Sequence, residues 1–133
     1  MPTGDISMVG PILSSSSPTI QIELWGIWGP PKSPEFYEAV VDTGFTGGVS
    51  IPILRALPLG LALFSTANFT LADGSTDSTL LCLGMARMGT EERSTVFSLS
   101  KGNEILVGTE FLSDFGAKFE LDYKTMTYSL VSQ

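Results

Sequence analysis

The sequence predicts an all-β fold, a closed or partly open β-barrel with one or two short helices. Short segments of alternating or continuous apolar residues recur along the chain, as in strands. Glycine and proline are frequent, with 14 and 8 residues among 133, and many lie between these segments. Many short strands separated by such turns are typical of closed or nearly closed β architectures.

The N-terminal part is expected to be a flexible segment, residues 1–18. It contains at most one short strand, within residues 6–13, and the serine run at 14–17 is typical of a flexible connector. A single domain is expected over residues 19–133, because a chain of this length usually forms one domain.

The first half of the domain is expected to begin with two strands. Residues 20–28 open with apolar residues that alternate with polar ones, which is typical of a half-buried strand. Residues 36–41 end in a continuous apolar run, which is typical of a strand buried on both faces. The next elements expected are a strand at 49–51, a short helix at 52–57 with proline in its first turn, and a strand at 67–71.

The second half is expected to alternate strands with short turns. Asp73-Gly74 matches the commonest two-residue hairpin turn, and a long strand is expected after it at 75–88. Residues 89–93 are expected to form a charged turn. The later elements expected are strands at 94–99, 105–107, 119–123 and 126–131, and a short helix at 109–115.

Charge and missing residue types exclude several classes of function. The chain has 14 acidic and 7 basic residues and a net charge of −7, which argues against a nucleic-acid partner, because phosphate binding needs clustered Lys and Arg. An anionic membrane partner is disfavoured for the same reason. The sequence has no histidine, and Cys82 is its single cysteine, so a Ser-His-Asp or Cys-His triad, the usual zinc sites and an internal disulfide are excluded. We expect no metal and no cofactor.

The N-terminus lacks the basic region and long apolar core of a secretory signal. The most apolar segment, residues 51–64, is interrupted by Arg55, two prolines and Gly60, so it is not expected to span a bilayer. A cytoplasmic location is therefore expected.

Asp42 is the candidate functional residue. The apolar run at 39–41 leads directly into this carboxylate, which Thr43 and Gly44 follow. A carboxylate at the end of a buried strand needs hydrogen bonds or another charge to compensate it, and Asp-Thr-Gly supplies a hydroxyl and backbone N–H groups. The tripeptide alone is also typical of a turn in which Asp caps its own backbone.

A second segment echoes the first. Residues 40–45 (Val-Val-Asp-Thr-Gly-Phe) align with residues 106–111 (Leu-Val-Gly-Thr-Glu-Phe). A degenerate two-fold repeat would explain the similarity, and a chance match is the alternative. In either case Gly108 stands where an internal partner of Asp42 would be expected.

Residues 41–47 resemble the active-site loop of aspartic proteases. The chain from Ile20 to Val131 is similar to single-domain, prokaryotic-type members of the retropepsin-like branch, clan AA. Residues 105–108, followed by Phe-Leu, resemble the second family motif, and residues 71–75 fall where the family has its flap hairpin. Phe45 differs from the alanine usual in retroviral enzymes, so the shape of the pocket is expected to differ.

The resemblance implies an aspartic endopeptidase that hydrolyses peptide bonds of extended polypeptides. Aspartic proteases are the standard example of two carboxylates that share one proton. This chain has a single Asp-Thr-Gly, so the second carboxylate would be Asp42 of another copy, and a homodimer is implied. Activity is expected to peak at acidic to mildly acidic pH.

The resemblance also implies roles for individual residues. The catalytic loop would consist of Asp42, Thr43 and Gly44. Substrate would be bound by Thr46 and by flap residues that close over an extended peptide, namely Ala72, Asp73, Gly74 and Ser75. The expected partners are a second copy and a peptide or unfolded protein. The alternative is a catalytically inactive retropepsin-like module for binding or dimerisation.

Overall fold

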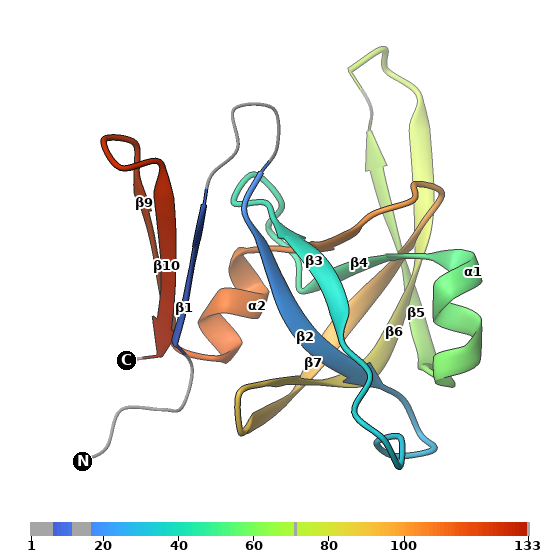
Figure 1. The fold of residues 1–133 in the computed structure, drawn as a ribbon. Helices are drawn as coiled ribbons and strands as arrows, with labels where there is room; N and C mark the ends of the chain where they lie inside the picture. The colour runs from blue at the N-terminus through green and yellow to red at the C-terminus, as the bar shows by residue number, and fades with distance from the viewer. Residues whose placement is uncertain (1–6, 12–16, 71, 133) are drawn as a thin grey trace.

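The computed structural model describes residues 7–11, 17–70 and 72–132, and their strands form two sheets (Figure 1). The strands are β1 (Ser7–Pro11), β2 (Thr19–Trp25), β3 (Tyr37–Val41), β4 (Val49–Pro52), β5 (Ala62–Thr70), β6 (Thr76–Met88), β7 (Glu91–Ser100), β8 (Ile105–Val107), β9 (Ala117–Asp122) and β10 (Thr127–Ser132). The helices are α1 (Ile53–Ala56), the 3₁₀ helix η1 (Leu57–Leu59) and α2 (Thr109–Asp114). The prediction of an all-β fold with short helices is confirmed.

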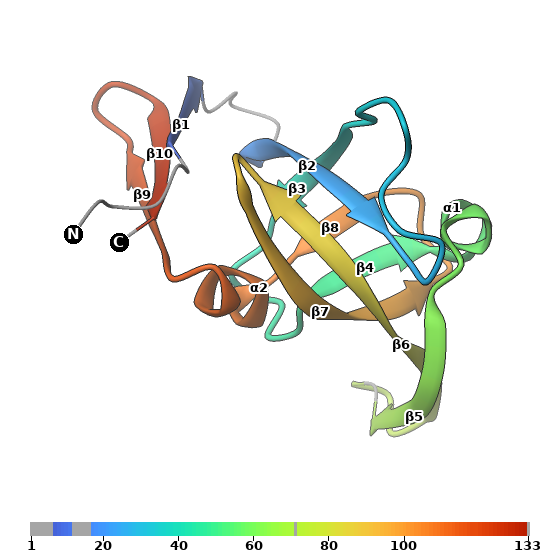
Figure 2. The same cartoon turned by 90° about the horizontal axis from the view of Figure 1, so that it is seen from below.

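The larger sheet closes into a barrel. Its strand order is β2-β3-β8-β4-β7-β6-β5, and β2 also pairs with β6. This additional pairing makes a ring of β2, β3, β8, β4, β7 and β6, which Figure 2 shows from below, while β5 pairs with β6 outside the ring. Within the ring β3 and β8 are parallel, and so are β4 and β7.

Apolar side chains from the strands fill the barrel, and α2 contributes to the same core. Burying a large apolar side chain of this kind stabilises the fold by about 1.5–3 kcal/mol. The largest fully buried side chains are Phe97, Phe111, Ile20, Ile22, Ile51, Met88, Ile105 and Leu130. Phe111 belongs to α2, and the others belong to segments that were expected to form strands.

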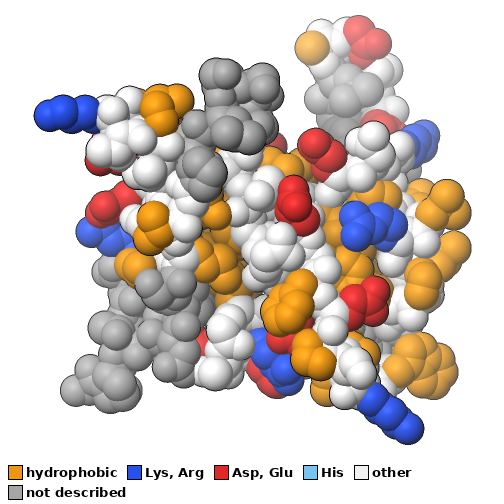
Figure 3. Space-filling model, in the orientation of Figure 1, with side chains coloured by type: hydrophobic (Ala, Val, Ile, Leu, Met, Phe, Trp, Pro, Cys, Tyr) orange, Lys and Arg blue, Asp and Glu red, His pale blue; other side chains and the backbone are white. Residues whose placement is uncertain are grey.

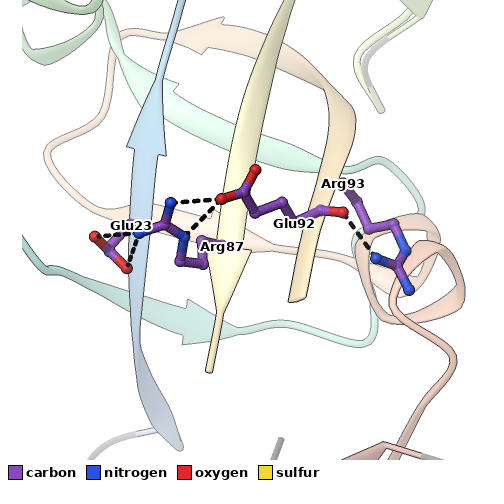
Figure 4. A network of polar contacts seen from close by, with 4 residues as sticks. All are labelled: Glu23, Arg87, Glu92 and Arg93. Carbon is purple, nitrogen blue, oxygen red and sulfur yellow. Dashed lines mark hydrogen bonds and ion pairs between the residues drawn. The ribbon is translucent and has the colours of Figure 1, made fainter. Parts of the chain in front are cut away.

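A polar network lies where the barrel closes (Figure 4). Glu23 of β2 is 6% exposed and stands opposite Arg87 of β6 in the strand register. Arg87 Nη1 lies 3.4 Å from both carboxylate oxygens of Glu23, and Arg87 Nε donates to Glu92 Oε1 at 3.0 Å. The guanidinium also stacks over the ring of Trp25 at 5.0 Å from its centroid. Arg87 therefore joins β2, β6 and β7.

The smaller sheet has the order β1-β10-β9 and is antiparallel throughout. It stands beside the barrel in both ribbon views, and Tyr128 and Leu130 of β10 reach into the main core. β1 lies in the N-terminal segment and pairs with β10 from Ser7–Val131 to Pro11–Thr127. The expected connector at 14–17 lies outside the described residues except for Ser17, and a domain boundary after residue 18 stays a prediction.

Two predicted turns were wrong in length. Thr70 pairs with Thr76, so the β5–β6 connection comprises residues 71–75 rather than a two-residue turn. The side chain of Asp73 accepts a hydrogen bond from the backbone N–H of Ser75 at 2.9 Å, and this local hydrogen bond stabilises a wider turn.

The β6–β7 turn, in contrast, is shorter than predicted, because Met88 pairs with Glu91. The charged residues after position 90 lie in β7, where Glu92 and Arg93 make ion pairs.

The strand predicted at 67–71 is also longer than expected. β5 begins at Ala62, and Leu71 lies outside the described residues. The register with β6 shifts between Leu63 and Ser65, which indicates a β-bulge. A bulge interrupts the alternation of side chains, so the first part of β5 lacks the pattern that predicts a strand.

Hydrophobic side chains gather on the surface at the right-hand side of Figure 3, over α1 and β5. The exposed large hydrophobic residues of α1, β5 and the adjoining η1 are Ile53, Leu54, Leu57, Leu63 and Phe64. They lie on the side opposite the three-stranded sheet. None of the helices in the described part of the chain is long and apolar enough to cross a membrane.

Candidate active site

Asp42 lies immediately after the last residue of β3, in the barrel wall. Its backbone N–H donates to the carbonyl of Val107 in the parallel neighbour β8 at 3.0 Å. On the other side of β3, the N–H of Val41 donates to the carbonyl of Pro18 at 2.9 Å. Val41 is buried and Asp42 is half-buried. The carboxylate therefore leaves a strand that is held on both edges.

The loop after β3 folds back on the carboxylate. Gly44 N–H donates to Asp42 Oδ1 at 3.0 Å, and Phe45 N–H donates to the Asp42 carbonyl at 3.1 Å. A Cβ atom at Gly44 would lie 3.3 Å from the same Oδ1, which is a tight contact. Thr43 is exposed beside it. This geometry suits both an Asp-capped turn and a loop that presents one oriented carboxylate.

The loop after β8 crosses the loop after β3 at very short range. Val40 pairs with Leu106 and Val41 with Val107, so the two echoing segments run side by side in matching register. The N–H of Gly108 donates to the Gly48 carbonyl at 2.9 Å. A Cβ atom at Gly108 would lie well under 3.0 Å from two backbone carbonyl oxygens, those of Gly47 and Phe45. The position that matches Asp42 therefore has no room for a side chain.

A groove of about 770 Å³ runs from the Asp42 loop to the base of the β5–β6 hairpin. The loop contributes residues 44–48, β6 contributes residues 77–81, and the end of β7 with the following residue contributes 98–101. Its apolar walls include Ile53, Leu80, Leu81 and Leu99. Asp42 opens the loop that lines this groove but is not itself among the lining residues, and an open, largely apolar groove of this kind is a candidate ligand-binding site.

The structure brings some of the predicted site residues together. Gly44 and Thr46 line the groove, two and four residues after Asp42. Ala72, Asp73, Gly74 and Ser75 are exposed at the hairpin tip and are not among the lining residues. Figure 1 shows the tip projecting from the body toward the same end of the molecule as the loop after β3.

Asp73 is held within the hairpin tip. Its Oδ1 accepts hydrogen bonds from the Ser75 N–H at 2.9 Å and from the Ser75 hydroxyl at 2.5 Å. These bonds stabilise the ionised form and lower the pKa of the Asp73 carboxyl below its ordinary value. Both residues therefore define the shape of the tip.

Several lining residues were not singled out from the sequence, among them Ile53, Leu81 and Leu99. They lie on α1, β6 and β7, and their convergence depends on the barrel closing. Leu81 lies within the strand expected at 75–88, but the sequence pattern does not show which residues of that strand face the groove. No group of three His, Cys, Asp or Glu side chains among the described residues is placed to hold a metal ion.

Comparison with solved structures identifies the fold. A scan against protein-family models found no match, and a search of the curated proteins found no significant one. A retropepsin-like aspartic protease from Rickettsia conorii superposes with a TM-score of 0.65 at 14% identity, covering 99% of this chain and 95% of that one.

Two viral proteases also match. The EIAV protease complexed with the inhibitor HBY-793 has a TM-score of 0.61 at 14% identity, covering 81% of this chain and 96% of that one. The simian foamy virus (mac) protease, solved in solution, has a TM-score of 0.53 at 12% identity, covering 72% and 92%. The chain therefore has the retropepsin-like fold, as its sequence motifs predicted.

Proposed function

We propose that this chain is an aspartic endopeptidase that hydrolyses peptide bonds of extended polypeptides, with a catalytic dyad formed by Asp42 of two copies. The observation that carries the proposal is the position of Asp42. It follows a buried strand, its carboxylate is oriented by Gly44, and the loop that it opens lines a peptide-sized groove. The fold is shared with solved aspartic proteases.

A second copy is required because the chain cannot supply the second carboxylate at the matching position. Gly108 is enclosed by the carbonyl oxygens of Gly47 and Phe45, which exclude even a methyl group. Two-fold symmetry would instead place Asp42 of one subunit beside Asp42 of the other. The exposed Thr43 would then meet its counterpart across the same axis.

The two carboxylates would share one proton and act on one water molecule. The ionised carboxylate takes a proton from the water, whose oxygen attacks the scissile carbonyl carbon, while the protonated carboxyl donates to the carbonyl oxygen. A hydroxyl of the tetrahedral intermediate then gives its proton back to the carboxylate that had donated one, while the carboxyl that took its proton from the water protonates the leaving nitrogen and the C–N bond breaks. The Gly44 N–H remains bonded to one carboxylate oxygen of Asp42 and keeps it oriented.

The groove would hold the peptide in an extended conformation. Residues 77–81 of β6 lie along one side, and an extended chain can pair with a strand through its backbone while its side chains enter the apolar spaces. The flap residues at 72–75 would reach the peptide only when the hairpin closes, which is a common way to exclude water from a reaction site.

The proposal is tested with Asp42→Asn, which preserves the size of the side chain but removes its acid–base function. We expect the variant to remain folded and to dimerise like the parent. Its cleavage of an unfolded protein substrate should fall on the order of 10²- to 10⁴-fold. Asp114→Asn, an exposed position in the last turn of α2, is the matched control and should cleave like the parent.

Cleavage by Asp42→Asn at the parent's rate would contradict the assignment. Substrate binding without cleavage by the parent, at any pH between acidic and neutral, would favour the catalytically inactive binding module. Sedimentation of all three proteins provides the second criterion, because a strict monomer cannot form the dyad.

A further inference from the structure

Tyr128 connects the three-stranded sheet to the strand that ends at Asp42. It belongs to β10, it is 9% exposed, and its ring packs against Phe119 of β9 at 6.0 Å between ring centroids. Its hydroxyl donates a hydrogen bond to the backbone carbonyl of Thr19. Thr19 is the first residue of β2, 109 positions away in the chain.

The segment that accepts this hydrogen bond, Pro18–Thr19, is paired with Val40 and Val41, the two residues before Asp42. Thr19 pairs with Val40 in the β2–β3 register. The carbonyl of Pro18 accepts the N–H of Val41 at 2.9 Å. The opposite edge of β3 is paired with β8 through Val41 and Val107. The Pro18–Thr19 segment is therefore one of two supports for the end of β3, and the hydroxyl of Tyr128 fixes that support.

β1 covers the same tyrosine. Gly10 stands opposite Tyr128 in the β1–β10 register, and a Cβ atom at Gly10 would lie 2.6 Å from Cε1 of the ring and 2.9 Å from its hydroxyl oxygen. The absence of a side chain at Gly10 thus allows the ring to lie against the backbone of β1. Burial raises the pKa of the Tyr128 hydroxyl above its ordinary value. The hydroxyl therefore stays protonated, and able to donate its hydrogen bond, at acidic and neutral pH.

We propose that Tyr128 is a positioning residue for Asp42, acting through the Pro18–Thr19 segment. Its catalytic consequence rests on the function proposed above, whereas its structural consequence does not. Tyr128 is not among the residues that line the groove. Its loss should therefore change how well the carboxylate is placed and leave the peptide-binding surface as it is.

The test is Tyr128→Phe, which removes the hydroxyl and keeps the ring in the core. Tyr123→Phe is the matched control, because Tyr123 is exposed in the β9–β10 turn. Hydrogen exchange of the Val41 amide should be about five- to tenfold faster in Tyr128→Phe, as expected for the loss of one hydrogen bond. The Gly108 amide, which donates to Gly48, is the internal reference and should be unchanged. With a peptide substrate, kcat should fall by a similar factor while KM stays the same.

Three results would overturn the proposal: unchanged exchange at Val41, equal acceleration at Val41 and Gly108, or a higher KM with unchanged kcat. If Val41 exchanges faster but the parent cleaves no substrate, the structural coupling stands and the protease assignment fails. If the parent cleaves and Tyr128→Phe matches it in kcat and in Val41 exchange, the assignment stands and the coupling fails. The exchange measurement therefore separates the two claims.

Discussion

Asp42 and Gly108 follow two parallel strands at matching positions, but only one of them can carry a side chain. The difference comes from the loop after β3, whose Phe45 and Gly47 carbonyl oxygens fill the space that a Cβ atom at Gly108 would need. A Cβ atom in that place would overlap both oxygens. At the scale of single residues, the asymmetry of the site is therefore enforced by packing as well as by residue type.

Gly108→Ala should accordingly destabilise the protein and disturb the Asp42 loop. We expect a loss of about 1–3 kcal/mol in the free energy of unfolding, the usual cost of overpacking, measured by urea denaturation. Gly102→Ala is the control, because its Cβ atom would meet only Ser100 Oγ at 3.7 Å; a change within about 0.5 kcal/mol is expected there. Equal stability of both variants would contradict the close contact between Gly108 and the carbonyl oxygens of Phe45 and Gly47.

At the scale of elements, the barrel depends on the pairing of β2 with β6. This pairing comprises Glu23–Arg87, Leu24–Ala86 and Trp25–Met85. The first pair is a cross-strand ion pair with a buried carboxylate, and the arginine is also bonded to Glu92 of β7. A buried charge that loses its partner is costly, whereas an exposed ion pair contributes little.

Arg87→Met should therefore lower the urea midpoint several times more than Lys118→Met. The Lys118–Glu120 pair is exposed, with side-chain exposures of 54% and 56%, so its removal should change the free energy of unfolding by no more than about 0.5 kcal/mol. Glu23→Leu combined with Arg87→Met should recover part of the loss, because no unpaired charge is then buried. A double variant less stable than Arg87→Met would contradict this role of the network.

The elements show what local pattern can and cannot predict. The alternation at 20–24 and the apolar runs before Asp42 and Gly108 predicted β2, β3 and β8 close to their observed positions. The start of β5 was missed because a bulge breaks its alternation. The start of β7 was missed because its charged residues are typical of turns but are here paired across strands. Both errors arise from tertiary pairing, which a local pattern does not contain.

At the scale of the whole molecule, one folded chain supplies one of the two carboxylates that the proposed active site needs. Asp42, Gly44 and Thr46 could be predicted from the loop motif; Gly44 and Thr46 line the groove, while Asp42 opens the same loop and is not among the lining residues. Ile53, Leu81 and Leu99 could not, because they converge only when distant strands close the barrel. The same holds for Tyr128, whose link to Thr19 spans most of the chain. Motifs thus predicted the candidate carboxylate, while the surfaces that orient it and line the groove depend on the fold.

If one active site contains Asp42 from two subunits, mixing active and inactive subunits should lower the activity more than in proportion to the parent fraction. Parent and Asp42→Asn chains are unfolded together, refolded at a constant total concentration, and assayed for cleavage of an unfolded substrate. With equal amounts, random pairing leaves about one quarter of the dimers with two Asp42 carboxylates. We predict that activity follows the square of the parent fraction, at about one quarter of the parent value in the equal mixture. Activity proportional to the parent fraction, about one half in that mixture, would show that each chain carries a complete site and would contradict the account.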